Sequence, residues 1–481
     1  MNSIGSIHKF IFSIITISFV VVNYSNCQSI EYDKNIGAEN AKVVEVLMGL
    51  YVDKEMNEYV SNVGTRLVNE IEKNPFDFNF YIADTHIPNA FALPGGYIYV
   101  TRGILALINT EDELAGILAH EIIHVTERHS VKQMRGSILP GLLQLPGNIV
   151  GTVVDKDLGT MLNSPLTTSN KLFLASYSRS HETEADKKGA ELAGKAGYDP
   201  LALGIILERL AYTIEQITDE AEQKSYFDYH PYTPDRVRRI EKKSSKLEWT
   251  ETEKVSGDFP VPLSGLVVGL NPSQGIFREE VFIHPDLNFS INFPDEWECF
   301  NQSIAVGAVH KDQLGAIFVG LEDPSLSPEK HAMKFEENLE KSHGIKPALS
   351  EPRTVNENSG YLISLEDQSG DIIMYIHILW LNMDNKIFKL IGIAPKSLEP
   401  DLRTSALSLR TLTEDERYGV NVHKLKIVSA RESETLNELN ERSTGVLDIT
   451  LISLINGLDV NKTLTSDQLI KIVTEQKYIP E

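Results

Sequence analysis

Residues 110–124 read Thr-Glu-Asp-Glu-Leu-Ala-Gly-Ile-Leu-Ala-His-Glu-Ile-Ile-His, and this stretch decides how the surrounding chain folds. Thr110 followed three positions later by Glu113 fits a capping box, which predicts that a helix begins here. Apolar residues recur on one side of that helix, as expected for a helix that packs one face into a core. The stretch is therefore predicted to be an amphipathic helix inside a folded domain.

The end of this helix carries the motif H-E-x-x-H. His120 and His124 stand one turn apart, about 40° around the axis, so both imidazoles can converge on one Zn²⁺ ion. Glu121 lies about 100° from His120, where it can act as general base toward a water bound to the metal. His129 would lie about 180° from His120 and is therefore predicted to end the helix or to support a ligand. The motif predicts one Zn²⁺ per chain, with His120 and His124 as ligands and Glu121 as the catalytic base.

A catalytic zinc ion takes a third protein ligand and leaves its fourth position to water. Glu182 and Glu184, in the stretch at residues 178–186, are the two candidates. If this stretch is helical, the two glutamates lie about 200° apart and cannot both face the metal. Asp186 shares the face of Glu182, where it could hydrogen-bond a ligand histidine and fix its tautomer. This pairing favours Glu182, while Glu184 stays the competing candidate.

The remainder of the first half combines helical spacing with one short sheet. Residues 76–82 alternate like a strand, and residues 89–100 read as strand, tight turn and strand. Residues 136–169 lack clean periodicity, and a lid, a membrane-touching loop and a packed surface loop all remain open for them. Helical patterns cover residues 37–75, 183–196, 200–216 and 234–246.

Four features follow one another within residues 35–245: the strands at Asn89–Val100, the H-E-x-x-H motif, Glu182-x-x-x-Asp186, and His230-Pro231 with Arg236. Together they resemble the gluzincin metallopeptidases related to HtpX, BepA and the CAAX prenyl endopeptidases. The resemblance implies a mostly helical zinc-peptidase fold with a small β-sheet. Because the chain has no pattern like the transmembrane helices of the integral-membrane members, it resembles the soluble, exported branch.

The resemblance also implies roles for individual residues. It places the third zinc ligand at Glu182, the first glutamate of E-x-x-x-D. His230 and Arg236 would reach the site and stabilise the oxyanion of the reaction. An extended peptide substrate would pair with the strand edge at Asn89-Ala90-Phe91.

The N-terminus is predicted to be a signal peptide of residues 1–27. Residues 10–22 form an uncharged, mostly apolar run that is too short to cross a bilayer of about 30 Å. Cleavage after Cys27 would leave Gln28 first, and lipidation of Cys27 is the alternative. Cys299 is the only other cysteine, so no intrachain disulfide would remain after cleavage. We expect export to the periplasm or cell envelope.

The composition excludes some classes of partner. Of 481 residues, 42% are hydrophobic and 23% are charged, which is typical of a globular protein. Lys and Arg number 45 against 68 Asp and Glu, for a formal net charge of −23. Because phosphate backbones would repel so acidic a chain, we expect no nucleic-acid partner.

The second half is predicted to be strand-rich. Gly, Pro and Ser mark residues 251–280 as a linker that follows a zinc metallopeptidase domain at residues 28–250. Strand patterns with one helix define an α+β module at residues 281–415. Residues 420–478 resemble a small LysM module, although Ser433-Glu434-Thr435-Leu436 stands where Gly-Asp-Thr-Leu is usual. The whole chain is predicted to be an α+β protein.

These features together predict a zinc-dependent endopeptidase that acts on proteins or peptides of the cell envelope, in protein quality control. The C-terminal modules would attach it peripherally to the outer membrane or the cell wall. The alternative is a non-catalytic envelope chaperone or cell-wall-binding protein that keeps zinc for structure. Glu121 favours the enzyme, because a structural zinc site has no use for a base.

Overall fold

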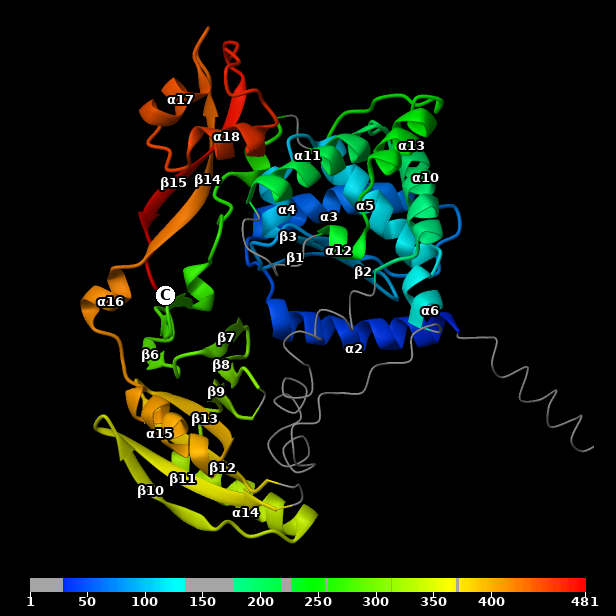
Figure 1. Ribbon diagram of the computed structural model, residues 1–481. Helices are drawn as coiled ribbons and strands as arrows, with labels where there is room; N and C mark the ends of the chain where they lie inside the picture. The colour runs from blue at the N-terminus through cyan, green and yellow to red at the C-terminus, as the bar shows by residue number, and fades with distance from the viewer. Residues whose placement is uncertain (1–28, 135–175, 218–225, 256–257, 313, 369–371) are drawn as a thin grey trace, which may run out of the picture.

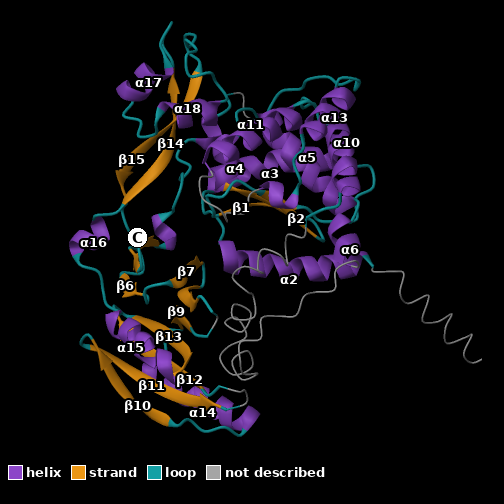
Figure 2. Ribbon diagram, viewed as in Figure 1, coloured by secondary structure: helices purple, strands orange, loops and turns teal. Residues whose placement is uncertain are grey.

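A computed structural model describes residues 29–134, 176–217, 226–255, 258–312, 314–368 and 372–481. The predicted signal peptide at residues 1–27 and the segment at residues 136–169 lie outside these described residues. The first half of the chain forms a helical body and the second half forms a strand-rich part beside it (Figures 1 and 2). The chain is therefore a mixed α+β protein, as predicted. None of the described helices combines the length and hydrophobicity needed to cross a membrane.

The helical body contains one three-stranded sheet, in the order β1-β3-β2, with β1 parallel and β2 antiparallel to β3. The strands are β1 (Asn79–Ala83), β2 (Ala90–Leu93) and β3 (Tyr97–Thr101). Gly95 and Gly96 form the predicted tight turn between β2 and β3, with φ angles of 84° and 110° that favour glycine. The helices are α2 (Ile30–Met48), α3 (Lys54–Asn69), α4 (Arg102–Leu107), α5 (Glu111–Thr126), α6 (His129–Met134), α10 (Arg179–Lys195), α11 (Ala202–Ile217), α12 (Tyr226–Tyr229) and α13 (Pro234–Ser244).

The sheet lies between helices on both of its faces. Figure 1 shows α2 on one side and α3 and α5 on the other. From α2, Ala41 and Val44 pack against Phe91 and Tyr99 of the sheet. The sheet therefore holds α5, which carries the H-E-x-x-H motif, against a fixed surface.

Helix α5 begins where the sequence predicts. The Thr110 hydroxyl accepts a hydrogen bond from the Glu113 amide at 3.1 Å, as in a capping box. The Glu113 carboxylate departs from the box, because it accepts from the Asn109 amide at 2.7 Å and pairs with Arg209. Nearly all of α5 is buried, since its polar face points toward other helices and not to solvent.

The second half contains a seven-stranded antiparallel sheet, in the order β10-β11-β12-β13-β9-β8-β7, and a three-stranded sheet, β4-β5-β6. This half is therefore strand-rich, as predicted. The strands are β4 (Ile276–Arg278), β5 (Val281–His284), β6 (Phe289–Asn292), β7 (Trp297–Gln302), β8 (Ala305–His310), β9 (Ala316–Glu322), β10 (Leu349–Val355), β11 (Asn358–Asp367), β12 (Met374–Met383) and β13 (Lys386–Pro395). The helices here are α14 (Pro328–His343), α15 (Glu399–Ser408) and α16 (Glu414–Tyr418).

The C-terminal segment packs directly on the helical body. It runs strand, helix, helix, strand: β14 (Asn421–Ser429), α17 (Leu436–Arg442), α18 (Ile449–Asn456) and β15 (Leu469–Lys477). Lys471 of β15 is fully buried, and its Nζ donates to the carbonyl oxygens of Ala106 and Ile108 at 2.7 and 2.8 Å. These carbonyls lie at the end of α4, directly before α5.

The described residues of the predicted linker, 251–255 and 258–280, include side chains that pack on the helical body. Leu263 and Leu266 are fully buried in the same core as α5. Val267 pairs with Lys424 of β14 as an isolated bridge. These apolar side chains contact both the helical body and the C-terminal strands.

Candidate metal centre and active site

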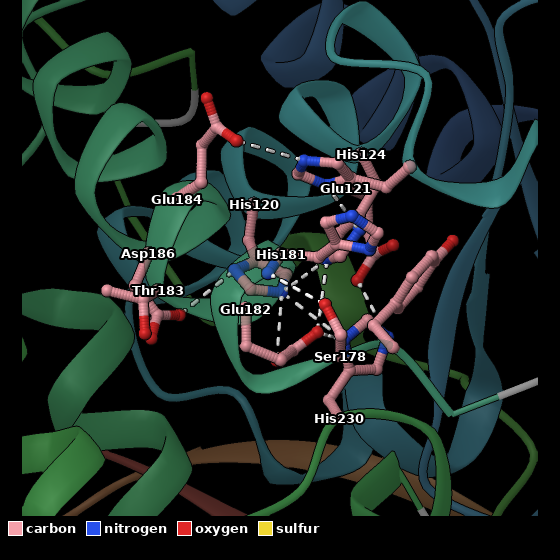
Figure 3. A network of polar contacts seen from close by, with 12 residues as sticks. His120, Glu121, His124, Ser178, His181, Glu182, Thr183, Glu184, Asp186 and His230 are labelled. Atoms are coloured by element: carbon pink, nitrogen blue, oxygen red, sulfur yellow. Dashed lines mark hydrogen bonds and ion pairs between the residues drawn. The ribbon is translucent and has the colours of Figure 1, made fainter. Parts of the chain in front are cut away.

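Four buried side chains from three parts of the chain form one cluster (Figure 3). His120 and His124 come from α5, Glu182 from α10, and His230 directly follows α12. Each offers one donor atom, and these atoms all lie within 4.8 Å of one another. Two or three imidazole nitrogens and one carboxylate oxygen make a ligand set that zinc binds.

The distances show why this cluster suits a cation. The Nε2 atoms of His120 and His124 lie 3.0 Å apart, and Glu182 Oε1 lies 3.3 Å from Nε2 of His124. His230 Nδ1 lies 3.2 Å from His120 Nε2 and 3.0 Å from Glu182 Oε1. Several lone pairs converge on one dry volume, and a metal ion would satisfy them together.

Glu121 lies beside this cluster without being part of it. It is fully buried, and neither of its carboxylate oxygens has a hydrogen-bond partner among the described residues. Burial raises the pKa of Glu121, and the charges of His230 and His120 only partly oppose that rise. A carboxylate with a raised pKa and free lone pairs can accept a proton at neutral pH.

Asp186 supports His120, as the helical spacing predicts. Its Oδ1 lies 3.1 Å from Nδ1 of His120, so that an Nδ1–H can donate to the carboxylate and leave the Nε2 lone pair for a metal. Helix α10 begins at Arg179, with Ser178 as its cap, so Glu182 and Asp186 do share a helical face. Figure 3 shows both side chains directed toward His120.

Arg236 lies directly beside the ligands, with its Nη2 3.5 Å from Nε2 of His120. Its side chain is 1% exposed, and it pairs with Asp186 through Nε and Nη2, at 3.0 and 2.8 Å. Its Nη1 lies 2.9 Å from Glu182 Oε2 and donates to the His230 carbonyl at 3.1 Å. The described partners of the guanidinium are thus the carboxylates of α10 and the His230 carbonyl, and its contact with an oxyanion stays a prediction.

The charges around Glu182 keep it ionised. Burial opposes ionisation, but the neighbouring His230 and His120 hold the pKa of Glu182 well below its usual range. Burial also lowers the pKa of His124 well below that of a free histidine, which keeps this imidazole neutral. Ionised carboxylate and neutral imidazole are the forms that bind a metal.

His230 was predicted to stabilise an oxyanion, and the structure places it in direct contact with the proposed metal ligands. Its ring stacks on Tyr226 with centroids 4.4 Å apart, and its Nε2 lies 3.4 Å from Glu121 Oε1. Burial lowers the pKa of His230, but the carboxylates of Glu182 and Glu121 raise it above the ordinary value. No local pattern marks this position, since the fold brings it to Glu182 from 48 residues away.

The predicted substrate strand is an edge strand, because β2 ends the order β1-β3-β2. Asn89 and Ala90 are buried, and the Asn89 amide donates to the Thr101 hydroxyl at 2.9 Å. The Phe91 ring stacks on Tyr99 at 5.0 Å and belongs to the core under α2. Pairing with a substrate would therefore involve the backbone of this strand, and it stays a prediction.

Two further residues contact a ligand: Tyr177, which was not predicted, and His129, which was predicted to end the helix or to support a ligand. Tyr177 stacks on the ring of His124 with centroids 3.7 Å apart, and its hydroxyl lies 2.8 Å from that of Ser130. His129 Nδ1 lies 3.1 Å from Nδ1 of His124. The pattern of charges and spacing offers no signal for Tyr177, because an aromatic residue before a helix has many structural uses.

A helix with H-E-x-x-H and a glutamate from a second helix, converging on one buried point, define the class of H-E-x-x-H metallopeptidase domains. Residues 54–244 match the model of Peptidase family M48. The predicted relationship to the HtpX- and BepA-like metallopeptidases is thereby confirmed.

Individual relatives match over the same region. The chain is 29% identical over 189 residues to the beta-barrel assembly-enhancing protease of Yersinia pestis, covering 38% of each chain. It is 29% identical over 222 residues to the mitochondrial metalloendopeptidase OMA1 of Schizosaccharomyces pombe, covering 45% of this chain and 62% of that one. It is 27% identical over 197 residues to the metalloprotease LoiP of Escherichia coli, covering 40% and 72%. The first two relatives are thus matched over less than two thirds of their length.

Proposed function

We propose that the protein is a zinc-dependent endopeptidase that hydrolyses peptide bonds in proteins of the cell envelope. His120, His124 and Glu182 would hold the zinc ion. The observation that carries this proposal is the convergence of these three donors beside Glu121, whose buried carboxylate oxygens have no hydrogen-bond partner among the described residues. When bound, zinc supplies a Lewis acid and lowers the pKa of a coordinated water.

The protein's own residues would then move the proton. Glu121 accepts the proton of the attacking water and passes it to the amine that leaves. Asp186 orients His120, and Arg236 holds Asp186 and Glu182 in place. Nε2 of His230 lies 3.4 Å from Glu121 and would donate its N–H to an oxyanion, whereas Nδ1 faces the donor cluster and would bind the metal through its lone pair.

The alternative is a non-catalytic envelope protein with a structural zinc ion. Structural sites are closed by four protein ligands, and His230 could supply the fourth. Glu121 argues against this alternative, because burying a carboxylate without a hydrogen bond costs several kcal/mol and a structural site gains nothing from it. A catalytic base explains that cost.

The test is a paired measurement on purified protein. We expect about one zinc ion per chain in both the unaltered protein and Glu121→Gln, since the change removes no ligand. Digestion of casein should fall by about 10²–10⁴-fold in the variant, the usual contribution of a general base. Equal digestion by both proteins would refute the mechanism, and zinc without any digestion by the unaltered protein would favour the structural alternative.

Location and attachment also remain proposals. The relative from Yersinia pestis carries a name that refers to β-barrel assembly, which supports an envelope substrate and a role in protein quality control here. We place a signal peptide at residues 1–27, the peptidase domain at 28–250, an α+β module at 281–415 and a LysM-like module at 420–478. The two C-terminal modules would provide peripheral attachment to the outer membrane or cell wall, and fractionation with and without residues 420–478 would test this.

A further inference from the structure

The two histidines of the H-E-x-x-H motif differ in the group that faces Nδ1, the ring nitrogen directed away from the proposed metal. His120 has Asp186 behind its Nδ1, at 3.1 Å. Among the described residues, no carboxylate lies within that distance of Nδ1 of His124, which instead faces Nδ1 of His129, also at 3.1 Å. A neutral imidazole carries one N–H and one lone pair, so only one of these two nitrogens can donate.

The direction of this hydrogen bond follows from the site. Nε2 of His124 points into the donor cluster, 3.0 Å from Nε2 of His120, and must present a lone pair to bind a metal. Its hydrogen is then on Nδ1, so His124 donates and the Nδ1 of His129 accepts. His129 in turn carries its hydrogen on Nε2, which lies 3.4 Å from Glu184 Oε2. His129 thus fixes the tautomer of His124, and Glu184 fixes the tautomer of His129.

The backbone places His129 in this position by interrupting the helix. Helix α5 ends at Thr126, and Arg128 has a left-handed φ of 56°, so that α6 begins anew at His129. Arg128 donates to the buried carboxylate of Asp33 from Nε and Nη2, at 2.5 and 2.8 Å. A continuous helix would direct His129 to the opposite face, whereas this turn buries its ring completely.

Glu184, at the far end of this series of hydrogen bonds, is itself held by neighbouring residues. Lys188 donates to Glu184 at 2.7 Å and to Glu127 at 2.6 Å, which ties α10 to the end of α5. His181 stacks on the ring of His129 with centroids 4.3 Å apart and planes 13° from parallel. Figure 3 shows Glu184 directed away from Glu182.

We propose that His129 and Glu184 are positioning residues of the metal centre: His129 accepts from His124 and fixes its tautomer, and Glu184 fixes that of His129. This inference rests on the proposed zinc site but not on peptidase activity. It gives Glu184, the competing ligand candidate, a role one step further from the metal. Loss of a partner behind a ligand histidine typically weakens metal binding by about 10–100-fold.

The test is the dissociation constant of Zn²⁺, measured by competition with a chromogenic chelator. His129→Phe keeps a flat ring against His181 but cannot accept a hydrogen bond, so we expect zinc affinity to fall by about 10–100-fold. His129→Asn places an amide oxygen near the position of Nδ1, and we expect it to restore the affinity to within about fivefold of the unaltered protein. Glu184→Ala should weaken affinity less, by about two- to fivefold, because water can replace an exposed carboxylate.

His181→Phe is the matched control, since it preserves the stacking and removes no group from the hydrogen-bonded chain. Thermal unfolding of the metal-free proteins separates packing from positioning: the inference requires that Phe and Asn differ in zinc affinity and not merely in stability. If His129→Phe does not fold, His129→Leu against His129→Asn gives the same comparison. Unchanged zinc affinity in His129→Phe, or an equal loss in His129→Phe and His129→Asn, overturns this inference and leaves the proposed function intact. An unaltered protein that binds no zinc overturns the proposed function as well.

Discussion

Glu182 and Glu184 lie two positions apart on α10 and contact different histidines: Glu182 Oε1 is 3.3 Å from Nε2 of His124, whereas Glu184 Oε2 is 3.4 Å from Nε2 of His129. The Glu182 side chain is 5% exposed, whereas the Glu184 side chain is 38% exposed. The helical rotation between the two positions explains the separation, because residues two apart face opposite sides of a helix.

We therefore predict opposite results for two alanine substitutions. Glu182→Ala should lose stoichiometric zinc, because two histidines alone hold the ion weakly and Arg236 would be left beside an empty space. Glu184→Ala should retain about one zinc per chain, with only a small loss of affinity. Metal content by mass spectrometry after gel filtration measures both. Zinc retained by Glu182→Ala and lost from Glu184→Ala would reverse the assignment.

Gly189 sets how closely α10 approaches α5. A Cβ atom at this position would lie 3.2 Å from both Cα and N of His120, which is tighter than ordinary contact and involves backbone that cannot rotate away. We predict that Gly189→Ala lowers the free energy of unfolding by about 1–3 kcal/mol, the usual cost of overpacking, and weakens zinc binding by moving Glu182 away from His120.

Gly204 on α11 provides the control for this substitution. Its Cβ would lie 3.5 Å from the nearest atom, a side-chain carbon of Ile240, which is normal van der Waals contact. Gly204→Ala should therefore raise stability by about 0.5–1 kcal/mol through helix propensity alone. Urea unfolding of both variants measures the difference, and two shifts of the same sign would contradict this account of Gly189.

Local patterns predicted the parts of the site that one element contains. The H-E-x-x-H helix and its start at Thr110 depend on spacing within a single helix, and Glu182 with Asp186 depends on one turn of α10. The detailed place of Arg236 could not be predicted, because a basic residue in an amphipathic helix is usually solvated. Lys471 is the clearest such case: only the docking of β15 on the end of α4 buries it.

Arg236 is predicted to matter through the charges it neutralises. Removing it leaves Glu182 and Asp186 as buried carboxylates with one fewer cation, and breaking such a buried pair typically costs about 3–5 kcal/mol. We expect Arg236→Met to lower the free energy of unfolding of the metal-free protein by about that amount. Arg238→Met, two residues further along the same helix with a side chain 72% exposed, should change stability by less than about 0.5 kcal/mol. Similar unfolding curves for the two variants would show that Arg236 is not a structural cation.

His284 makes the stability of the strand-rich module depend on pH. Its ring lies against Phe289, and its Nδ1 accepts from the Leu287 amide at 3.3 Å. Burial and then the charge of Lys386 lower the pKa of His284 to about 4. An unfolded histidine titrates near about 6.5. Between these two values the unfolded chain binds a proton at this residue and the folded chain does not.

The sign of the effect follows from that difference. Because the unfolded state binds more protons, the free energy of unfolding falls as the pH is lowered from about 7 and stops falling, for this residue, near pH 4. We expect a contribution of about 1–2 kcal/mol between pH 7.5 and 5.0, after allowance for partial solvent screening. His284→Asn keeps an acceptor for the Leu287 amide but does not titrate, so its loss of stability over this range should be smaller by that amount. Urea unfolding at both pH values measures it, and parallel losses in the two proteins would mean that His284 titrates alike in the folded and unfolded states.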